Sequence, residues 1–208
     1  MRRHAAKALM PEIAPLSDAK DVSIERHTPG EAGVWIIIFG DMLMFSFMFG
    51  VFLFYRRADL ALFQSSQALL NQTFGLINTF LMLTSSWFVA KAVKAARFHR
   101  GRETVIMFRL ALACGAGFSV VKIAEYTQKI RAGIVINSND FFVYYYMFTG
   151  IHFLHVLIGM GVLAFMASYA SDGQFSEIKI GHIESGATFW HLVDLLWIAL
   201  FALLYLLR

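Results

Sequence analysis

The stretch that decides the fold is residues 184–198, Glu-Ser-Gly-Ala-Thr-Phe-Trp-His-Leu-Val-Asp-Leu-Leu-Trp-Ile. It places Glu184, His191 and Asp194 in or beside an otherwise apolar run. Ionisable groups at such a depth are costly in hydrocarbon, and they are tolerated mainly where they face protein or trapped water. The stretch therefore indicates a membrane-spanning segment whose polar residues serve a function or a specific helix contact.

The composition of the whole chain also indicates a membrane protein. Of the 208 residues, 58% are apolar and 15% are charged, whereas globular chains are about 45 to 50% apolar and about 25% charged. The excess lies in long apolar runs and is not spread at helical spacing. A soluble domain is therefore excluded, and lipid is the expected solvent for most of the chain.

Five apolar runs are long enough to cross a bilayer, whose core of about 30 Å needs about 20 helical residues. They lie at 33–55, 74–93, 105–126, 141–169 and 187–207. A membrane barrel would show strands of about 10 residues with strict alternation, which these runs lack. We predict an all-α polytopic membrane protein in which residues 1–32 form a polar cytoplasmic tail and residues 33–208 form a domain of five transmembrane helices.

The Lys and Arg residues predict the orientation, because basic short loops stay on the cytoplasmic side. Ten lie in the tail and in the second and fourth loops, and five lie on the other side. We therefore expect the N-terminus in the cytoplasm and the C-terminus outside. Orientation and attraction to anionic lipid head groups account for the basic excess, so it does not indicate nucleic-acid binding.

Five ionisable residues share one layer near mid-membrane in the predicted spans. Asp41 lies roughly 12 Å from the inner end of the first span, at a rise of about 1.5 Å per residue. His191 and Asp194 lie about 10 and 15 Å beyond Glu184. His152 and His155 lie roughly 16 and 21 Å from the outer end of the fourth span. Depth alone leaves their lateral arrangement open.

Two of these pairs, His152 with His155 and His191 with Asp194, have i, i+3 spacing and so share a side of their helix. One interpretation is an intramembrane enzyme that uses these four residues as metal or haem ligands, as in bundles where Glu and His converge from several helices. The other is a hydrogen-bonded network that joins helices in lipid. We favour the network, because no Glu-x-x-His pair lies inside a span.

Lys122 and Glu125 form another i, i+3 pair, near the outer end of the third span. We expect them to act as salt-bridged or snorkelling anchors. The aromatic residues at the start of the fourth span predict a belt at the outer membrane interface. These are Phe141, Phe142, Tyr144, Tyr145 and Tyr146.

Four motifs resemble those of a known membrane family. They are Gly40-Asp41, Glu125-Tyr126, Thr149-Gly-Ile-His-Phe-Leu-His-Val-Leu-Ile-Gly159, and Glu184 followed by Phe189-Trp-His-Leu-Val-Asp-Leu-Leu-Trp197. Together they are similar to subunit III of the haem-copper oxidases, in its short five-helix form. The resemblance runs from Gly30 to Leu207.

Within that family, residues 28–31, 39–42, 66–75 and 84–86 most resemble the NorE type, whose members are associated with nitric oxide reductases. Two positions depart from the respiratory oxidases. Asp41 stands where those proteins usually carry Glu, and Phe153 stands where they usually have Gly.

The resemblance implies a non-catalytic accessory subunit in the bacterial inner membrane, bound to the catalytic subunit of a cytochrome c oxidase, quinol oxidase or nitric oxide reductase. Haem and copper or iron would lie in that partner and not in this chain. The chain would hold phospholipid in a cleft between its first helices and the remaining bundle, and it would support proton uptake and enzyme lifetime during turnover. We expect the polar-network or proton-related residues to be Asp41, Glu125, His152, His155, Glu184, His191 and Asp194.

Overall fold

A computed structural model describes residues 32–207 of the chain. The predicted tail, apart from Ala32, and the motif at 28–31 therefore lie outside the described residues. The helices are α1 (Ala32–Ala58), α2 (Leu60–Ala68), α3 (Gln72–Arg97), α4 (Gly101–Arg131), α5 (Asp140–Tyr169) and α6 (Glu177–Phe201), followed by a π-helical turn, η1 (Ala202–Leu206). Within the described range, five helical segments are long and apolar enough to cross a membrane. The all-α prediction with five spans is confirmed.

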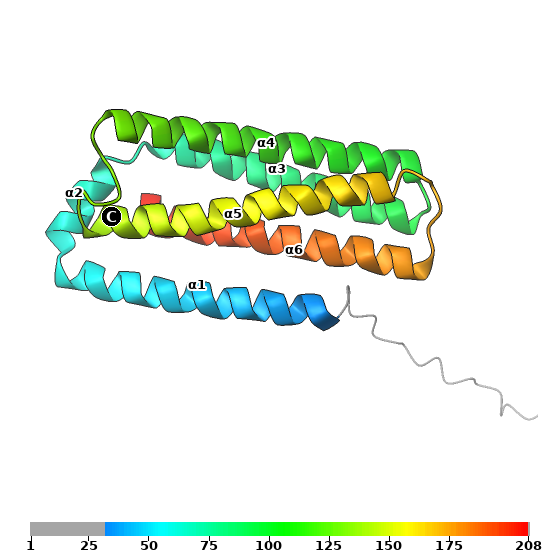
Figure 1. Ribbon diagram of the computed structural model, residues 1–208, viewed down its shortest axis with the longest axis horizontal. Helices are drawn as coiled ribbons and strands as arrows, with labels where there is room; N and C mark the ends of the chain where they lie inside the picture. The colour runs from blue at the N-terminus through cyan, green and yellow to red at the C-terminus, as the bar shows by residue number, and fades with distance from the viewer. Residues whose placement is uncertain (1–31, 208) are drawn as a thin grey trace, which may run out of the picture.

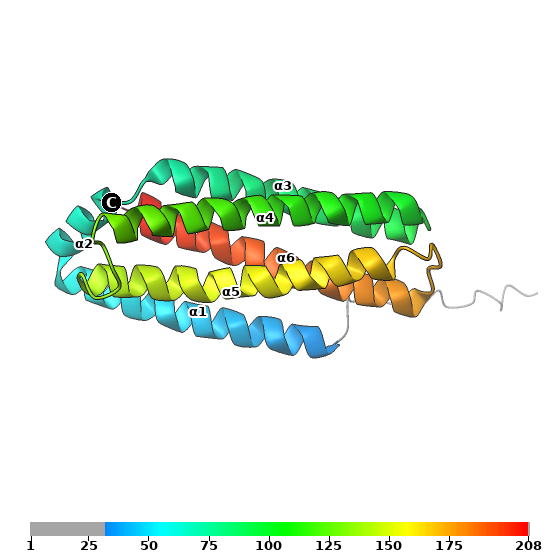
Figure 2. The same cartoon turned by 45° about the horizontal axis from the view of Figure 1, so that its top comes forward.

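The helix α1 lies along the edge of a bundle formed by α3, α4, α5 and α6 (Figures 1 and 2). Short connections make successive long helices antiparallel. One end of the bundle thus holds the C-terminal ends of α3 and α5 and the N-terminal ends of α4 and α6 (Figure 1). Of the five spans, α1 is the least buried and α6 the most buried. In this layout α6 packs against α1, α3 and α5.

The short helix α2 lies in a segment that the sequence predicts to be a loop. Asp59 begins it by accepting a hydrogen bond from the backbone amide of Leu62, and Phe63 packs into the core. Gln67 donates to the carbonyls of Leu203 and Leu204 near the end of the last span. With nine residues, α2 is too short for a hydropathy criterion that searches for spans.

The last helix begins ten residues before the predicted start of the fifth span, at Glu177. Ser176 caps it by accepting a hydrogen bond from the amide of Lys179. The helix thus continues through a polar turn where hydropathy predicts a loop, because side-chain capping satisfies the free backbone groups. As a consequence, Glu184 lies within α6 and not before it.

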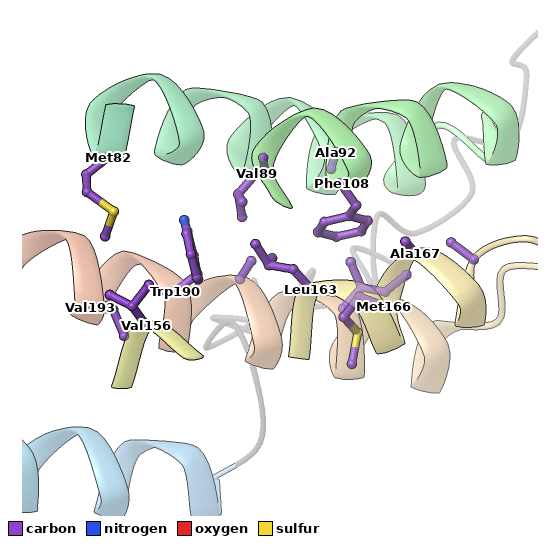
Figure 3. Close-up of a cluster of buried hydrophobic side chains, with 14 of the residues drawn as sticks. Met82, Val89, Ala92, Phe108, Val156, Leu163, Met166, Ala167, Trp190 and Val193 are labelled. Carbon is purple, nitrogen blue, oxygen red and sulfur yellow. The ribbon is translucent and has the colours of Figure 1, made fainter. Parts of the chain in front are cut away.

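The main core cluster is built around Trp190, which projects from α6 towards α3 and α4 (Figure 3). Two glycines let the backbones of α4 and α5 approach this ring. A Cβ on Gly159 would lie 2.7 Å from Trp190 Cε3, and one on Gly115 would lie 3.1 Å from Trp190 Cη2. Small residues permit such close helix contact in membranes.

The predicted aromatic belt is wrong for Phe141, Phe142 and Tyr145, which are buried. They belong to a second core cluster that also contains Phe63 of α2 and Tyr205 of η1. The belt prediction assumes that the start of the fourth span meets the membrane interface directly. In the structure, α2 and the end of the last span pack against these side chains.

Candidate functional site

The contact between Asp41 and His155 joins α1 to α5. Asp41 Oδ2 lies 3.3 Å from His155 Nε2, and the two side chains are 19% and 14% exposed. Phe45, one turn further along α1, packs its ring edge-to-face with the imidazole. The structure therefore brings together two residues that the sequence places at the same depth but on different helices.

A hydrogen bond within α5 sets which nitrogen of His155 faces Asp41. His155 Nδ1 lies 2.9 Å from the backbone carbonyl of Ile151, and a carbonyl can only accept, so Nδ1 carries a hydrogen. Nε2 is therefore the ring nitrogen that faces the carboxyl group of Asp41.

His152 lies one turn before His155 on α5 but has a different environment. It is fully buried and stacks on Trp197, with the two ring centroids 5.4 Å apart. Its ring also makes an edge-to-face contact with Phe118, with ring centroids 5.8 Å apart. Neither ring nitrogen has a hydrogen-bond partner among residues 32–207. The predicted interhelical hydrogen bond is therefore wrong for His152, which packs as an aromatic side chain.

His191 and Asp194 lie on α6, at its contact with α3. His191 Nδ1 is 2.7 Å from Ser86 Oγ, which is an interhelical hydrogen bond. Asp194 Oδ2 lies 3.7 Å from the same nitrogen, too far for a hydrogen bond. Neither carboxyl oxygen has a hydrogen-bond partner in the described part of the chain. The predicted interhelical bond is thus present for His191 and absent for Asp194.

Glu125 is at the centre of a closed polar network between α4, α5 and η1. Lys122 Nζ donates to Glu125 Oε2 at 3.0 Å and to the hydroxyls of Tyr145 and Tyr205 at 3.3 Å each. Both hydroxyls donate in turn to Glu125 Oε1, at 2.9 and 2.7 Å. All three ammonium hydrogens of Lys122 therefore have an acceptor.

The predicted salt bridge between Lys122 and Glu125 is present, but the snorkelling anchor is wrong, since both side chains are only 1% exposed. Sequence reasoning missed Tyr205 altogether and assigned Tyr145 to the interface. Both tyrosines lie at the same end of the bundle as Glu125, and this shared depth was the available signal. A buried ammonium group needs several hydrogen-bond acceptors, and tyrosine hydroxyls at the same depth can supply them.

Glu184 forms a salt bridge from α6 to the last turn of α3. Its Oε1 is 2.8 Å from both Nε and Nη2 of Arg97. Glu184 is buried, whereas the Arg97 side chain is 54% exposed. The sequence assigns Arg97 to a cytoplasmic loop, but α3 extends to this residue, so its charge is available inside the bundle.

The predicted polar residues therefore form separate contacts and do not converge. The contact of Asp41 with His155 joins α1 to α5, whereas that of Ser86 with His191 and that of Arg97 with Glu184 both join α3 to α6, at different depths. Among residues 32–207, no group of three or more His, Cys, Asp and Glu side chains could hold a metal ion. The intramembrane metalloenzyme interpretation needs His152, His155, His191 and Asp194 to converge, and they do not.

Five spanning helices joined by buried polar contacts define a polytopic helical membrane protein. The family model described as cytochrome c oxidase subunit III matches residues 27–208. The chain belongs to this family, which confirms the resemblance seen in the motifs of the first, third, fourth and fifth spans.

Three curated relatives illustrate the range of the family. Cytochrome c oxidase subunit 3 of Bacillus sp. (strain PS3) is 23% identical over 204 residues, covering 98% of this chain and 97% of the relative. That of Synechocystis sp. (strain ATCC 27184 / PCC 6803 / Kazusa) is 27% identical, covering 87% and 82%. Quinol oxidase subunit 3 of Bacillus subtilis (strain 168) is 28% identical, covering 84% and 85%. The NorE type stays a prediction.

Proposed function

We propose that this chain is a non-catalytic accessory subunit of a respiratory haem-copper enzyme. Its role would be to support assembly, lipid binding and proton uptake by a catalytic subunit that holds haem and copper or iron. The observation that carries the proposal is the family match across residues 27–208. Relatives named as subunit 3 of cytochrome c oxidases and of quinol oxidases support the association with a catalytic subunit.

The orientation that goes with this function places the N-terminus in the cytoplasm and the C-terminus outside. The turn between α3 and α4 supports it, because Lys94, Arg97, Arg100 and Arg102 gather there at one end of the bundle. Positively charged short loops remain on the cytoplasmic side of bacterial inner membranes.

An apolar groove between α1, α5 and α6 supports the lipid-binding part of the proposal. Its volume is about 560 Å³, and its lining includes Ile37, Ile158, Phe165 and Phe189. The first three of these side chains are exposed. A groove lined almost wholly by hydrocarbon suits an acyl chain, which would pack between α1 and the bundle.

The contact between Asp41 and His155 supports the proton-uptake part, because it brings together two side chains that can exchange a proton. The pair lies at a helix contact that is partly exposed, so exchange with a neighbouring subunit or with water is sterically open. In this role the pair would store one proton and release it to a path in the catalytic subunit. The structural alternative is that the pair only fixes α1 against α5.

Nitric oxide reductase is the second candidate partner. It is favoured by the segments similar to the NorE type, one of which contains Asp41. The relatives named above are subunits of cytochrome c and quinol oxidases, so an oxidase is the first candidate.

Extraction of the native membrane with mild detergent is expected to recover this chain together with a haem-containing partner. The isolated chain is expected to show no oxidase or reductase turnover. Reduced-minus-oxidised spectra of the complex, and its turnover with cytochrome c, quinol or nitric oxide, identify the partner. Recovery of the chain only as a free species in several mild detergents would contradict the proposal.

Asp41→Asn separates the proton role from the structural role. The Asn amide can donate to Nε2 of His155, so the complex is expected to assemble normally, while position 41 no longer has a carboxyl group that could pass on a proton. We expect slower turnover with a deficit that grows as the pH rises, because free protons become scarcer. Wild-type turnover and enzyme lifetime of this variant across the pH range would exclude the proton role.

Asp41→Leu tests the structural role. It should weaken assembly by about 0.6 to 2 kcal/mol, and normal assembly of that variant would exclude the structural role.

A further inference from the structure

A second groove lies between α3 and α6, with a volume of about 600 Å³. Ala90 and Val93 of α3 and Ala187 of α6 form apolar parts of its lining, and Lys94 and Arg97 line it near the end of α3. His191 lies further along α6, about 10 Å beyond Glu184 at 1.5 Å per residue. The groove thus reaches from the charged end of a span towards the interior of the membrane.

The two basic residues of this groove are available to an anion. Arg97 contacts Glu184 through Nε and Nη2, and its side chain is still 54% exposed. Lys94 is exposed, and its side chain has no partner within residues 32–207. With Glu184 neutralised by Arg97, the ammonium of Lys94 gives the groove one net positive charge.

The basic residues and the apolar lining of the groove together indicate which class of ligand it would bind. A phosphodiester carries one negative charge, which matches Lys94, and a guanidinium binds phosphate oxygens in a fixed geometry. An acyl chain attached to that phosphate would lie along Ala90, Val93 and Ala187. The groove beside α1 contains no Lys or Arg in its lining, so it lacks this selectivity.

We propose that the groove between α3 and α6 binds an anionic phospholipid, with the phosphate at Lys94 and Arg97 and one acyl chain along the apolar lining. The site is separate from the groove beside α1. It lies at the end of the bundle where basic residues gather, and attraction to anionic head groups acts on such residues. It would therefore distinguish phosphatidylglycerol from phosphatidylcholine.

The test measures lipid binding to the full chain in its detergent-extracted complex by native mass spectrometry. The probes are phosphatidylglycerol, phosphatidylcholine with the same acyl chains, and inorganic phosphate. Phosphatidylglycerol should bind more tightly than the other two, and Lys94→Gln should weaken it about fivefold. The matched control is Lys91→Gln, one turn earlier on α3. Lys91 lies over the Trp87 ring and outside the groove lining, so the change should stay within about twofold.

A second variant tests the acyl-chain part of the site. Ala90→Phe fills the groove without removing a charge, and it should weaken binding of phosphatidylglycerol while leaving Lys94 in place. Equal binding of the two lipids, or phosphatidylglycerol binding that is unchanged in Lys94→Gln, overturns the proposal. Binding of inorganic phosphate as tight as that of the lipid, with no effect of Ala90→Phe, assigns the site to free phosphate. A cross-link from position 90 to the catalytic subunit in the intact complex assigns it to protein. Both results overturn the lipid assignment.

Discussion

Lys122→Met is expected to cost the protein about 3 to 5 kcal/mol of stability, because removing one partner of a buried ion pair leaves the other charge without compensation. Glu125 would keep its two tyrosine donors but lose the ammonium 3.0 Å away, in a site that is 1% exposed. Met has nearly the length of the Lys side chain, so the loss would be electrostatic and not a large cavity. Reversible unfolding in mixed detergent micelles measures it.

The double variant Lys122→Met with Glu125→Gln should recover most of this loss, because it removes both charges and keeps an acceptor for the tyrosine hydroxyls. The control is the Arg100–Glu103 pair, which also has i, i+3 spacing but is 65% and 45% exposed. Arg100→Met should cost less than about 1 kcal/mol. If Lys122→Met cost no more than Arg100→Met, the interior network would not be a stabilising element.

Gly159→Ala is expected to destabilise the bundle by about 1 to 3 kcal/mol through overpacking. The new methyl group would lie 2.7 Å from Trp190 Cε3 and 2.9 Å from Trp190 Cζ3. Trp190 is fully buried and is held on several sides by the main core cluster, so neither partner can move cheaply. A lower melting temperature of the detergent-solubilised protein would show the effect.

Gly161→Ala is the matched control, on the same helix and two residues away. A Cβ at this position has nothing within 4 Å, so the change should be neutral or stabilising by up to about 1 kcal/mol. Trp190→Phe in the Gly159→Ala background should restore part of the loss, since the smaller ring removes the clash. Equal melting temperatures for the two alanine variants would contradict the close approach of α5 to α6.

The sequence predicts the depth of the polar residues well but not their neighbours. A fixed rise per residue gives the depth of Asp41 and His155, and they do meet. Their neighbours around the bundle depend on helix order and rotation, which hydropathy does not encode. His152 and His155 have spacing typical of one helix side, yet the small angle between them is enough to place one in an aromatic core and the other against α1.

Residues near the ends of spans are the hardest to assign from sequence. A charge such as Lys122 close to an end is normally able to reach water. Here α2 packs against the end of the last span, and Tyr205 and Tyr145 cover the ammonium. The helix α2, which has nine residues, lies in a segment that the sequence predicts to be a loop. Burial at Lys122 is thus a tertiary effect without a local signal.

The position of α1 at the edge of the bundle affects how the chain is made. Asp41 leaves the ribosome about a hundred residues before His155, its contact on α5. At roughly 5 to 20 residues per second, the carboxyl group waits about 5 to 20 s for that histidine. An ionisable side chain without a partner is costly in lipid during this interval. We therefore expect the insertion of α1 to be least favourable early in synthesis and to become more favourable once α5 supplies His155.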